Sequence, residues 1–380
     1  MPRALIPLSV LDLVPISSGS DAAAALRNTV DLAGRAESAG YARYWIAEHH
    51  LNPGVAGSAP ALVVSLVAAA THRIRVGSGA VQLGHHTPLS VVEQFGIVDA
   101  LHPGRIDLGL GRSGSGRPPA DTAAEPPAAR TTARGLVIPS KPSLAAVLRS
   151  PRSTAQRALL QQPGAQTPPY ADQVAEILAL LRGDYCSDDG YHVHATPGLG
   201  ADVEVWILGS SGGDSARLAG ELGLPFGANY HVSPATVLEA VDAYREAFRP
   251  SGTLADPHVL VSADAVVAAD DRTAQELASP YGLWVHSIRT GQGAIEFPTP
   301  AEAAQHDWTP DDRALVADRL ATQFVGSPSM VADQLEVLAE ETAADELLVT
   351  TITHDHADRV RSYELLAREW SARAHRPARD

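Results

Sequence analysis

The sequence predicts an α/β protein built as a (β/α)8 barrel. Apolar runs that read as buried strands alternate with helical segments along 380 residues, and eight such runs can be counted. Histidines, glycines and serines gather directly behind several of these runs, at the strand ends where a barrel carries its reactive groups. The alternation alone also fits an open doubly wound sheet, and the number of strands favours the closed barrel.

The first half of the chain supplies four predicted strands, at residues 5–11, 42–47, 74–83 and 105–110. Ser20 and Asp21 are typical of a helix start, and Gly40 suits the residue after a helix, so a helix is predicted between them. Two more helices are predicted over 60–70 and 88–101.

The second half supplies the other four strands, at residues 203–208, 224–229, 258–268 and 346–352. Helices are predicted over 172–181 and over 216–222.

We expect a single domain, residues 1–380, interrupted by two insertions. The first, at about 113–169, is rich in Pro, Ala, Ser and Arg and contains only short helical pieces near 144–148 and 155–160. The second lies at about 291–308. Loops after barrel strands lie on the face where active sites form, so both insertions are candidates for lids or pocket walls. A partly disordered connection is the alternative interpretation of residues 114–134.

Composition excludes several classes of function. The 44 acidic against 29 basic residues give a net charge of −15, which disfavours nucleic acid and anionic membrane surfaces as partners. The single cysteine, Cys186, excludes an internal disulfide framework and fits a reducing cytoplasm. The longest apolar stretch, residues 59–70, is too short to span a bilayer, so a cytoplasmic protein is expected.

Glu48, His49 and His50 follow the second predicted strand. Side chains alternate along a strand, so one histidine is expected to face the barrel mouth while its neighbour packs sideways or bonds Glu48. An exposed histidine pair on a loop is the alternative. His85 and His86 follow the third strand, whose small residues 77–80 leave room for a flat ring or mark a tight barrel bend.

Two glycine-containing turns suit an anion. Strand four runs into Gly111 and Arg112, and strand five runs into Gly209, Ser210 and Ser211 before a helix. Free backbone N–H groups at a helix N-terminus bind phosphate, and an arginine adds a charge-assisted hydrogen bond.

Other cofactor and metal motifs are missing. Neither the glycine-rich dinucleotide fingerprint after the first strand nor a nucleotide P-loop occurs, and no serine-hydrolase elbow is present. His354 and His356 have a metal-like spacing, but no matching carboxylates stand at other strand ends, so no metal site is predicted.

Four segments together resemble the bacterial-luciferase-like, flavin-dependent monooxygenases: A-E-H-H, I-R-V-G-S-G-A-V-Q-L, H-P-G-R-I-D-L-G-L-G-R, and W-I-L-G-S-S with S-A-R-L-A. The resemblance covers residues 1 to about 113 and 172–270 well, and the C-terminal region loosely. It implies a barrel that binds reduced FMN, reacts it with O2 to a C4a-peroxyflavin, and oxygenates a small organic substrate such as an aldehyde or a polyketide. It also implies a separate NAD(P)H:flavin reductase and a homodimer.

The resemblance assigns roles to residues. His49 would stand beside the flavin ring and handle protons as the catalytic residue, and the Gly79–Ala80 peptide bond would be cis beneath the ring. The expected cofactor-binding residues are Glu48, Gly79, Ala80, Arg112, Gly209, Ser210 and Ser211. The expected substrate-pocket residues are His50, His86, Asn229, Tyr230 and His231.

Three other functions remain open at this stage. A deazaflavin-dependent oxidoreductase of the same superfamily would transfer hydride without using oxygen, although A-E-H-H favours FMN. A flavin-binding or partner subunit without catalysis is the second alternative, and a metal-dependent hydrolase is the third.

Overall fold

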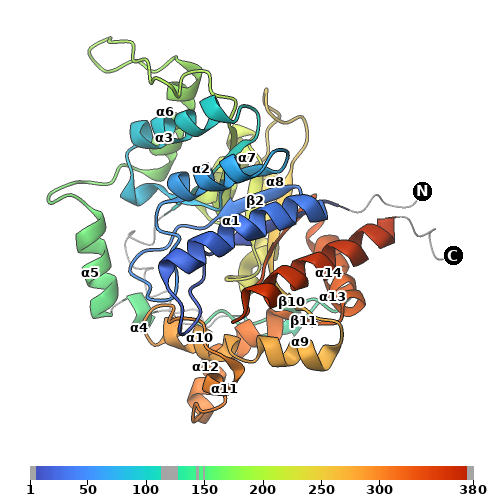
Figure 1. Cartoon of the computed structure of the whole chain (residues 1–380). Coiled ribbons are helices and arrows are strands. Elements are labelled where there is room, and N and C mark those ends of the chain that lie inside the picture. The colour runs from blue at the N-terminus through green and yellow to red at the C-terminus, as the bar shows by residue number, and fades with distance from the viewer. Residues whose placement is uncertain (1–5, 113–126, 143–144, 149, 375–380) are drawn as a thin grey trace.

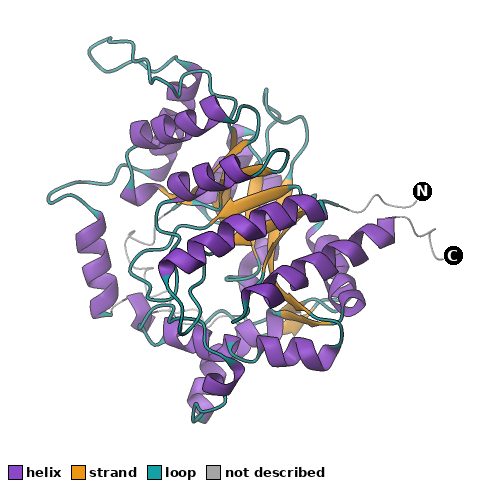
Figure 2. Cartoon of the chain, in the orientation of Figure 1, coloured by secondary structure: helices purple, strands orange, loops and turns teal. Residues whose placement is uncertain are grey.

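The computed structural model describes residues 6–112, 127–142, 145–148 and 150–374. Eight parallel strands form a closed ring, because the two end strands of the path, β9 and β10, also pair with each other. Helices surround this ring on the outside (Figure 2). In ring order the strands are β1 (Leu8–Asp12), β2 (Arg43–Ile46), β3 (Arg75–Ser78), β5 (Ile106–Gly111), β8 (Glu204–Gly209), β9 (Phe226–Asn229), β10 (Val259–Val267) and β12 (Glu346–Thr350). The predicted (β/α)8 barrel is confirmed.

The helices on the outside of the barrel are placed by caps that the sequence carries. Asp21 accepts a hydrogen bond from the N–H of Ala24 at 2.7 Å and starts α1, and Gly40 ends it with a left-handed φ of 88°. The outer helices are α1 (Ala22–Ala39), α2 (Pro60–Ala70), α3 (Pro88–Leu101), α6 (Tyr170–Arg182), α7 (Asp214–Leu222), α8 (Val237–Ala247), α13 (Pro328–Thr342) and α14 (His356–Ala374) (Figure 1).

The N-terminal end of the barrel interior is filled by a charge network. The guanidinium of Arg43 contacts Asp107 at 2.9 Å, Glu204 at 3.1 Å and Glu346 at 3.1 Å. Burial raises the pKa of the Asp107 carboxyl, and the positive charges of Arg43 and Arg75 oppose that rise. Four strands are therefore held together at this end by paired charges rather than by apolar side chains.

Two tryptophans form the next layer of the interior. Trp45 and Trp206 are fully buried and pack edge to face with ring centroids 5.2 Å apart. The indole N–H of Trp45 donates to Asp107 at 2.8 Å, so this layer is tied to the charged layer below it. Aliphatic side chains, among them Leu11 and Leu260, continue the packing toward the C-terminal end.

The third predicted strand differs from the structure. The prediction of one strand over 74–83 is wrong, because the chain is divided into β3 and β4 (Val81–Gln82). Between them the Gly79–Ala80 bond is cis, as the resemblance implies. The sequence also gave no sign of β11 (Phe324–Gly326), a short strand that pairs with the end of β10.

The first insertion contains a hairpin and two helices in its described part. The hairpin pairs β6 (Arg130–Thr131) with β7 (Val137–Ile138), and the helices are α4 (Ala145–Leu148) and α5 (Pro151–Leu160). The guanidinium of Arg152 donates to the carbonyl oxygens of His50 and Leu51, which fixes α5 to the loop after β2. Residues 113–126 of the predicted insertion lie outside the described residues.

The second insertion lies among four helices that stand between β10 and β11. They are α9 (Asp271–Ala278), α10 (Tyr281–Arg289), α11 (Pro300–Ala303) and α12 (Pro310–Thr322). The backbone N–H of Ala294 donates to the Asn52 side chain at 2.9 Å, and Phe297 donates to the carbonyl of Ile16 at 2.7 Å. This segment therefore packs on the loops after β1 and β2. None of the described helices is both long and apolar enough to cross a membrane.

Candidate active site

A cavity of about 1040 Å³ opens at the C-terminal ends of the strands, above the tryptophan layer. Its size is at the upper end of the range for small-molecule sites. The wall is formed by strand ends from around the ring and by one face of the first insertion. The residues are Leu11, Leu13, Ala47, Glu48, His49, Gly79, Ala80, Gln82, Gly111, Arg112, Leu148, Thr154, Arg157, Leu208, Gly209, Ser210, Ser215, Gly227, Ala228, Asn229, His231, Val232, Leu260, Ser262 and Leu348.

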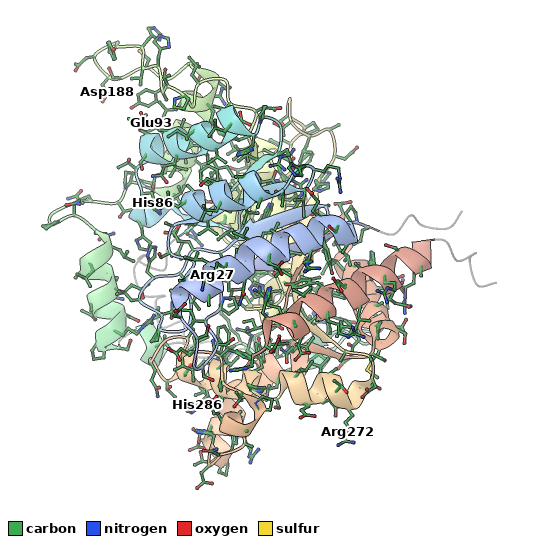
Figure 3. The ribbon with its side chains drawn as sticks, viewed as in Figure 1. Arg27, His86, Glu93, Asp188, Arg272 and His286 are labelled. Carbon is green, nitrogen blue, oxygen red and sulfur yellow. The ribbon has the colours of Figure 1, made fainter. Side chains whose placement is uncertain are left out.

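Glu48 is the centre of a hydrogen-bond network at the end of β2 (Figure 3 labels His86). Its Oε1 lies 2.7 Å from Nε2 of His50 and 2.8 Å from Nε2 of His86. Its Oε2 accepts the backbone N–H of Gln82 at 2.8 Å, and the Gln82 amide donates to the Glu48 carbonyl at 2.6 Å. Burial alone would raise the pKa of Glu48, but the hydrogen bonds from His50, His86 and Gln82 lower it to about 2. The carboxylate is therefore ionised at neutral pH.

His49 borders the cavity and is held by its backbone, whose N–H donates to the carbonyl of Gly57 at 2.7 Å. Burial lowers the pKa of the imidazole to about 4, although the negative charge of Glu48 opposes the shift. Its Nδ1 is buried and has no hydrogen-bond partner among the described residues. His49 is thus a neutral ring on the cavity wall, with one buried nitrogen that no described residue hydrogen-bonds.

His231 and Ser262 form a second polar pair on the cavity wall. Nδ1 of His231 lies 2.7 Å from the hydroxyl oxygen of Ser262 on β10. Burial lowers the pKa of His231 to about 3, and the nearby positive charge of Arg319 acts in the same direction. Both histidines on the wall are therefore neutral over the physiological pH range.

Gly77 and Gly79 lack side chains for two different reasons, and only Gly79 borders the cavity. A side chain at Gly79 would meet Leu11 at 2.8 Å and the indole of Trp45 at 3.2 Å, so the backbone here lies close to the apolar interior beside the cavity. A Cβ at Gly77 would instead stand 2.4 Å from the carbonyl oxygen of Asp107. Gly77 is therefore required by strand packing, and Gly79 and Ala80 are the residues that border the cavity.

Arg112 and the turn before α7 form the cationic end of the cavity. Gly213 precedes α7, and a Cβ there would stand 3.4 Å from Oγ of Ser211 and 3.9 Å from Nη2 of Arg112, so both groups lie near the start of α7. Nη1 of Arg112 lies 3.2 Å from a carboxylate oxygen of Asp214, and both side chains are exposed. The helix N-terminus and the guanidinium favour an anion here, while Asp214 competes for the same cation.

Most of the residues predicted for the site lie on one cavity. Nine of them border it: Glu48, His49, Gly79, Ala80, Arg112, Gly209, Ser210, Asn229 and His231. Ser211 lies outside the described wall, beside Arg112. His50 and His86 also lie outside it, because their rings are turned to Glu48.

The prediction that Tyr230 lines the pocket is wrong. Its side chain is fully buried, stacks on Phe324 with ring centroids 5.9 Å apart, and donates to the carbonyl of Val137 at 2.8 Å. Asn229 and His231 on either side border the cavity, whereas Tyr230, in the turn after β9, packs on β11 and the hairpin of the first insertion.

Sequence reasoning missed several residues of the wall. Ser262 had a signal, since it is a polar residue two positions after the inward-facing Leu260 on β10. Gln82 lies in a segment that carries the resemblance, and Ser215 lies in the first turn of α7. Leu148, Thr154 and Arg157 come from the first insertion, where no periodicity pointed to them.

The histidines at the start of α14 are not brought together. Nε2 of His354 lies 3.2 Å from Oγ of Ser18, whereas Nε2 of His356 lies 2.9 Å from a carboxylate oxygen of Asp31. Each ring has its own partner on the N-terminal part of the chain.

Comparisons with known proteins agree with this fold. A solved structure, that of apo-MsnO8, superposes with a TM-score of 0.79 at 30% identity and covers 97% of this chain and 98% of that chain. The oxygenating constituent of 3,6-diketocamphane monooxygenase from Pseudomonas putida, solved with FMN, has a TM-score of 0.64 at 20% identity and covers 98% of this chain and 100% of that one. An F420-dependent secondary alcohol dehydrogenase has a TM-score of 0.60 at 12% identity and covers 96% and 98%. The last two likenesses show the fold alone.

Sequence comparison is more specific. The uncharacterized protein YvbT of Bacillus subtilis (strain 168) is 39% identical over 96% of this chain and 97% of its own length. A luciferase-like monooxygenase of Escherichia coli (strain K12) is 34% identical over 95% of this chain and 96% of its own length. The family model for luciferase-like monooxygenases matches residues 6–133 and 162–346. The chain therefore belongs to the luciferase-like monooxygenase family.

Proposed function

We propose that this protein binds reduced FMN in the cavity and uses it with O2 to oxygenate a small organic substrate. The observation that carries the proposal is the position of His49, a neutral ring with a free buried nitrogen, on the same cavity wall as the Gly79–Ala80 backbone. Reduced FMN would come from a separate NAD(P)H:flavin reductase. The name of the diketocamphane protein, an oxygenating constituent, supports a division of this kind.

The residues present fit FMN at both ends. Arg112 and the free N–H groups at the start of α7 suit a phosphate, and Ser210 and Ser215 border the cavity beside them. Gly79 and Ala80 offer a surface without bulky side chains to a flat ring, with the apolar Leu11 and Trp45 behind it. The cavity volume of about 1040 Å³ leaves space for a second small molecule.

Bound reduced FMN would supply the electrons that activate O2. The chain's own task is to control protons and water around it. His49, whose pKa is lowered to about 4 by burial, stays unprotonated at neutral pH and is available as a base. Aliphatic side chains such as Leu13, Leu208 and Leu348 line the interior side of the cavity and limit the access of water.

We infer that α4 and α5 act as a lid in this reaction. Leu148, Thr154 and Arg157 on these helices face the cavity, and Arg152 anchors α5 to the loop that carries His50. The family match does not extend over residues 134–161, so this part of the wall differs from the region that the family shares. The lid is therefore the part of the chain in which we place substrate selection.

The experiment compares the reoxidation of reduced FMN by O2 with and without the protein in a stopped-flow instrument. We expect the protein to change the reoxidation rate, and we expect His49→Ala to lose that effect while the exposed control His72→Ala keeps it. Substrate turnover in the His49→Ala variant should fall by about 10²–10⁴-fold, the usual contribution of a general acid or base.

Two outcomes would favour the alternatives. Reoxidation as fast as in free solution, together with tight binding of a deazaflavin in a parallel titration, would favour the deazaflavin-dependent oxidoreductase. If FMN binds but is reoxidised as fast as in free solution, and no deazaflavin binds, the result would favour a flavin-binding subunit without catalysis.

We also propose that two copies of the chain pair through α2 and α3. Leu62 and Leu66 on α2 are 68% and 52% exposed, and Ile97 and Leu101 on α3 are 52% and 72% exposed. Each pair is spaced one helical turn apart, and the two helices pack side by side on the outside of the barrel (Figure 1). A contiguous exposed apolar face of this kind is typical of a protein interface.

A further inference from the structure

Two histidines and an aspartate converge at the outer side of α10 and α12, away from the described cavity wall. His286 lies on α10, His306 follows α11, and Asp312 lies in the first turn of α12. One potential ligand atom from each side chain lies within 4.8 Å of the other two. Nε2 of His286 is 2.9 Å from Oδ1 of Asp312, and the two imidazole centroids are 5.2 Å apart. Figure 3 labels His286 at this place.

One ring nitrogen of His306 has no hydrogen-bond partner among the described residues. This nitrogen, Nε2, is buried. Buried polar nitrogens in folded proteins nearly always have a partner, and an orphan of this kind points to a missing ion or water. One ring nitrogen of His306 lies within 4.8 Å of the ligand atoms of His286 and Asp312, so the three side chains meet in one small region.

The surroundings hold the cluster in the way that metal ligands are held. Asp312 divides its two oxygens, because Oδ2 accepts the N–H of Thr309 at 3.1 Å and its hydroxyl at 2.7 Å, while Oδ1 faces His286. The indole of Trp308 packs edge-on against His306 at 4.7 Å and against His286 at 5.9 Å, which supplies an apolar rim.

We propose that His286, His306 and Asp312 bind a divalent metal ion, and that Zn²⁺ is the ion best suited to these three ligands. Two imidazoles and one carboxylate form a ligand set typical of zinc, with a fourth position for water. Tetrahedral ligands at about 2.1 Å from zinc stand about 3.4 Å apart, so the side chains need only small rotations to close on the ion. His286 then carries its proton on Nδ1 and turns Nε2 to the metal.

The bound ion would join α10, the segment after α11 and the start of α12. The chain between His286 and Asp312 includes Ala294, which bonds Asn52 on the loop after β2, and Ile295, whose carbonyl lies against Gly54. The metal would therefore stabilise the segment that packs beside the barrel mouth. This inference does not depend on the proposed flavin chemistry.

The test uses untagged protein stripped with a chelator and then titrated with Zn²⁺ by isothermal calorimetry. We expect one ion per chain with micromolar or tighter affinity. Even outer partners of a metal site change its affinity by about 10–100-fold, so loss of the ligand in His306→Ala should weaken binding by about 100-fold or more. His306→Gln, which keeps a polar side chain of similar length, should lose binding equally, and the exposed control His72→Ala should bind as the unaltered chain does.

Two further measurements, of the unfolding temperature and of the Co²⁺ absorption spectrum, complete the test. Zn²⁺ should raise the unfolding temperature of the unaltered chain and of His72→Ala, but not of the His306 variants. Co²⁺ in place of Zn²⁺ should give the visible absorption of a four-coordinate ion, which His306→Gln abolishes. Absence of Zn²⁺ binding in the unaltered chain, or equal binding in the His306 variants, would overturn the proposal and leave the cluster as a packing contact.

Discussion

Nε2 of His86 lies 2.8 Å from Oε1 of Glu48, although 38 residues separate them in the chain. Glu48 lies just after β2 and His86 lies after β4, so this contact joins the loop after β2 to the segment that follows the cis Gly79–Ala80 bond. With His50 on the same oxygen, the carboxylate holds both histidines away from the cavity. His49 is therefore the histidine of the A-E-H-H segment that faces the cavity.

Glu48→Gln should lower the free energy of unfolding by about 1–3 kcal/mol, the cost of leaving a buried polar group without its partner. A carboxylate accepts hydrogen bonds at both oxygens, whereas an amide has one acceptor and one donor. The donor would then face either the Gln82 N–H or the two histidines. Urea unfolding measures the change, with the exposed Glu221→Gln as the matched control. Equal stability of the two variants would contradict this role for Glu48.

His231 should make the protein less stable as the pH falls below the ordinary histidine range. Its folded-state pKa, lowered by burial to about 3, is below the value of 6.5 for a free imidazole. Between these values the unfolded chain binds a proton that the folded chain does not, so the free energy of unfolding falls with falling pH. The effect is on the order of 5 kcal/mol for a shift of this size. The difference in pH profile between the unaltered chain and His231→Gln isolates it, and parallel profiles would refute it.

Asp214→Asn should tighten the binding of FMN. Asp214 neutralises Arg112 and repels a phosphate at the start of α7, and both side chains are exposed. Exposed ion pairs of this kind are worth about 0.2–1 kcal/mol, so we expect a gain of about two- to five-fold that shrinks with added salt. Fluorescence titration with FMN measures it, and riboflavin, which lacks the phosphate, serves as the control ligand. A similar gain for riboflavin would show that Asp214 acts elsewhere than on the phosphate.

Leu66→Glu should separate the proposed dimer. A charge in the middle of the apolar face of α2 and α3 would be buried without a partner in the pair. Light scattering after size exclusion measures the mass, and Leu159→Glu, on the exposed face of α5, is a control with a similarly exposed leucine. An unchanged mass in Leu66→Glu would move the interface away from α2.

The fold was predictable because its signals are local. Each barrel strand is a short apolar run, and caps such as Asp21 and Gly40 mark helix ends wherever the chain later packs. The acid and histidines after β2, and the glycine and serines after β8, could be assigned to one mouth because parallel strands deliver their ends to the same face. The sequence therefore predicted at which end of the barrel the site residues lie.

The directions of side chains were less predictable, because they depend on neighbours that the sequence does not place. Tyr230 was expected in the pocket with its two neighbours, but it lies in the turn after β9 and its ring stacks on Phe324 of β11. Gly77 was a candidate for contact with a flat ring, and its lack of a side chain is explained by Asp107 on the next strand. The convergence of His286, His306 and Asp312 arises from the packing of helices, and no spacing in the sequence indicated it.

The network of Arg43 with Asp107, Glu204 and Glu346 separates the residues that stabilise the barrel from the residues that line the cavity. It secures the barrel from the end opposite the mouth, and effects of well-separated substitutions on stability are nearly additive. Substitutions at Asn229 or along α5 should therefore have little effect on the stability that the charge network contributes to the barrel. After gene duplication, substitutions at the cavity mouth can therefore change the substrate, while selection for stability preserves the charge network at the opposite end.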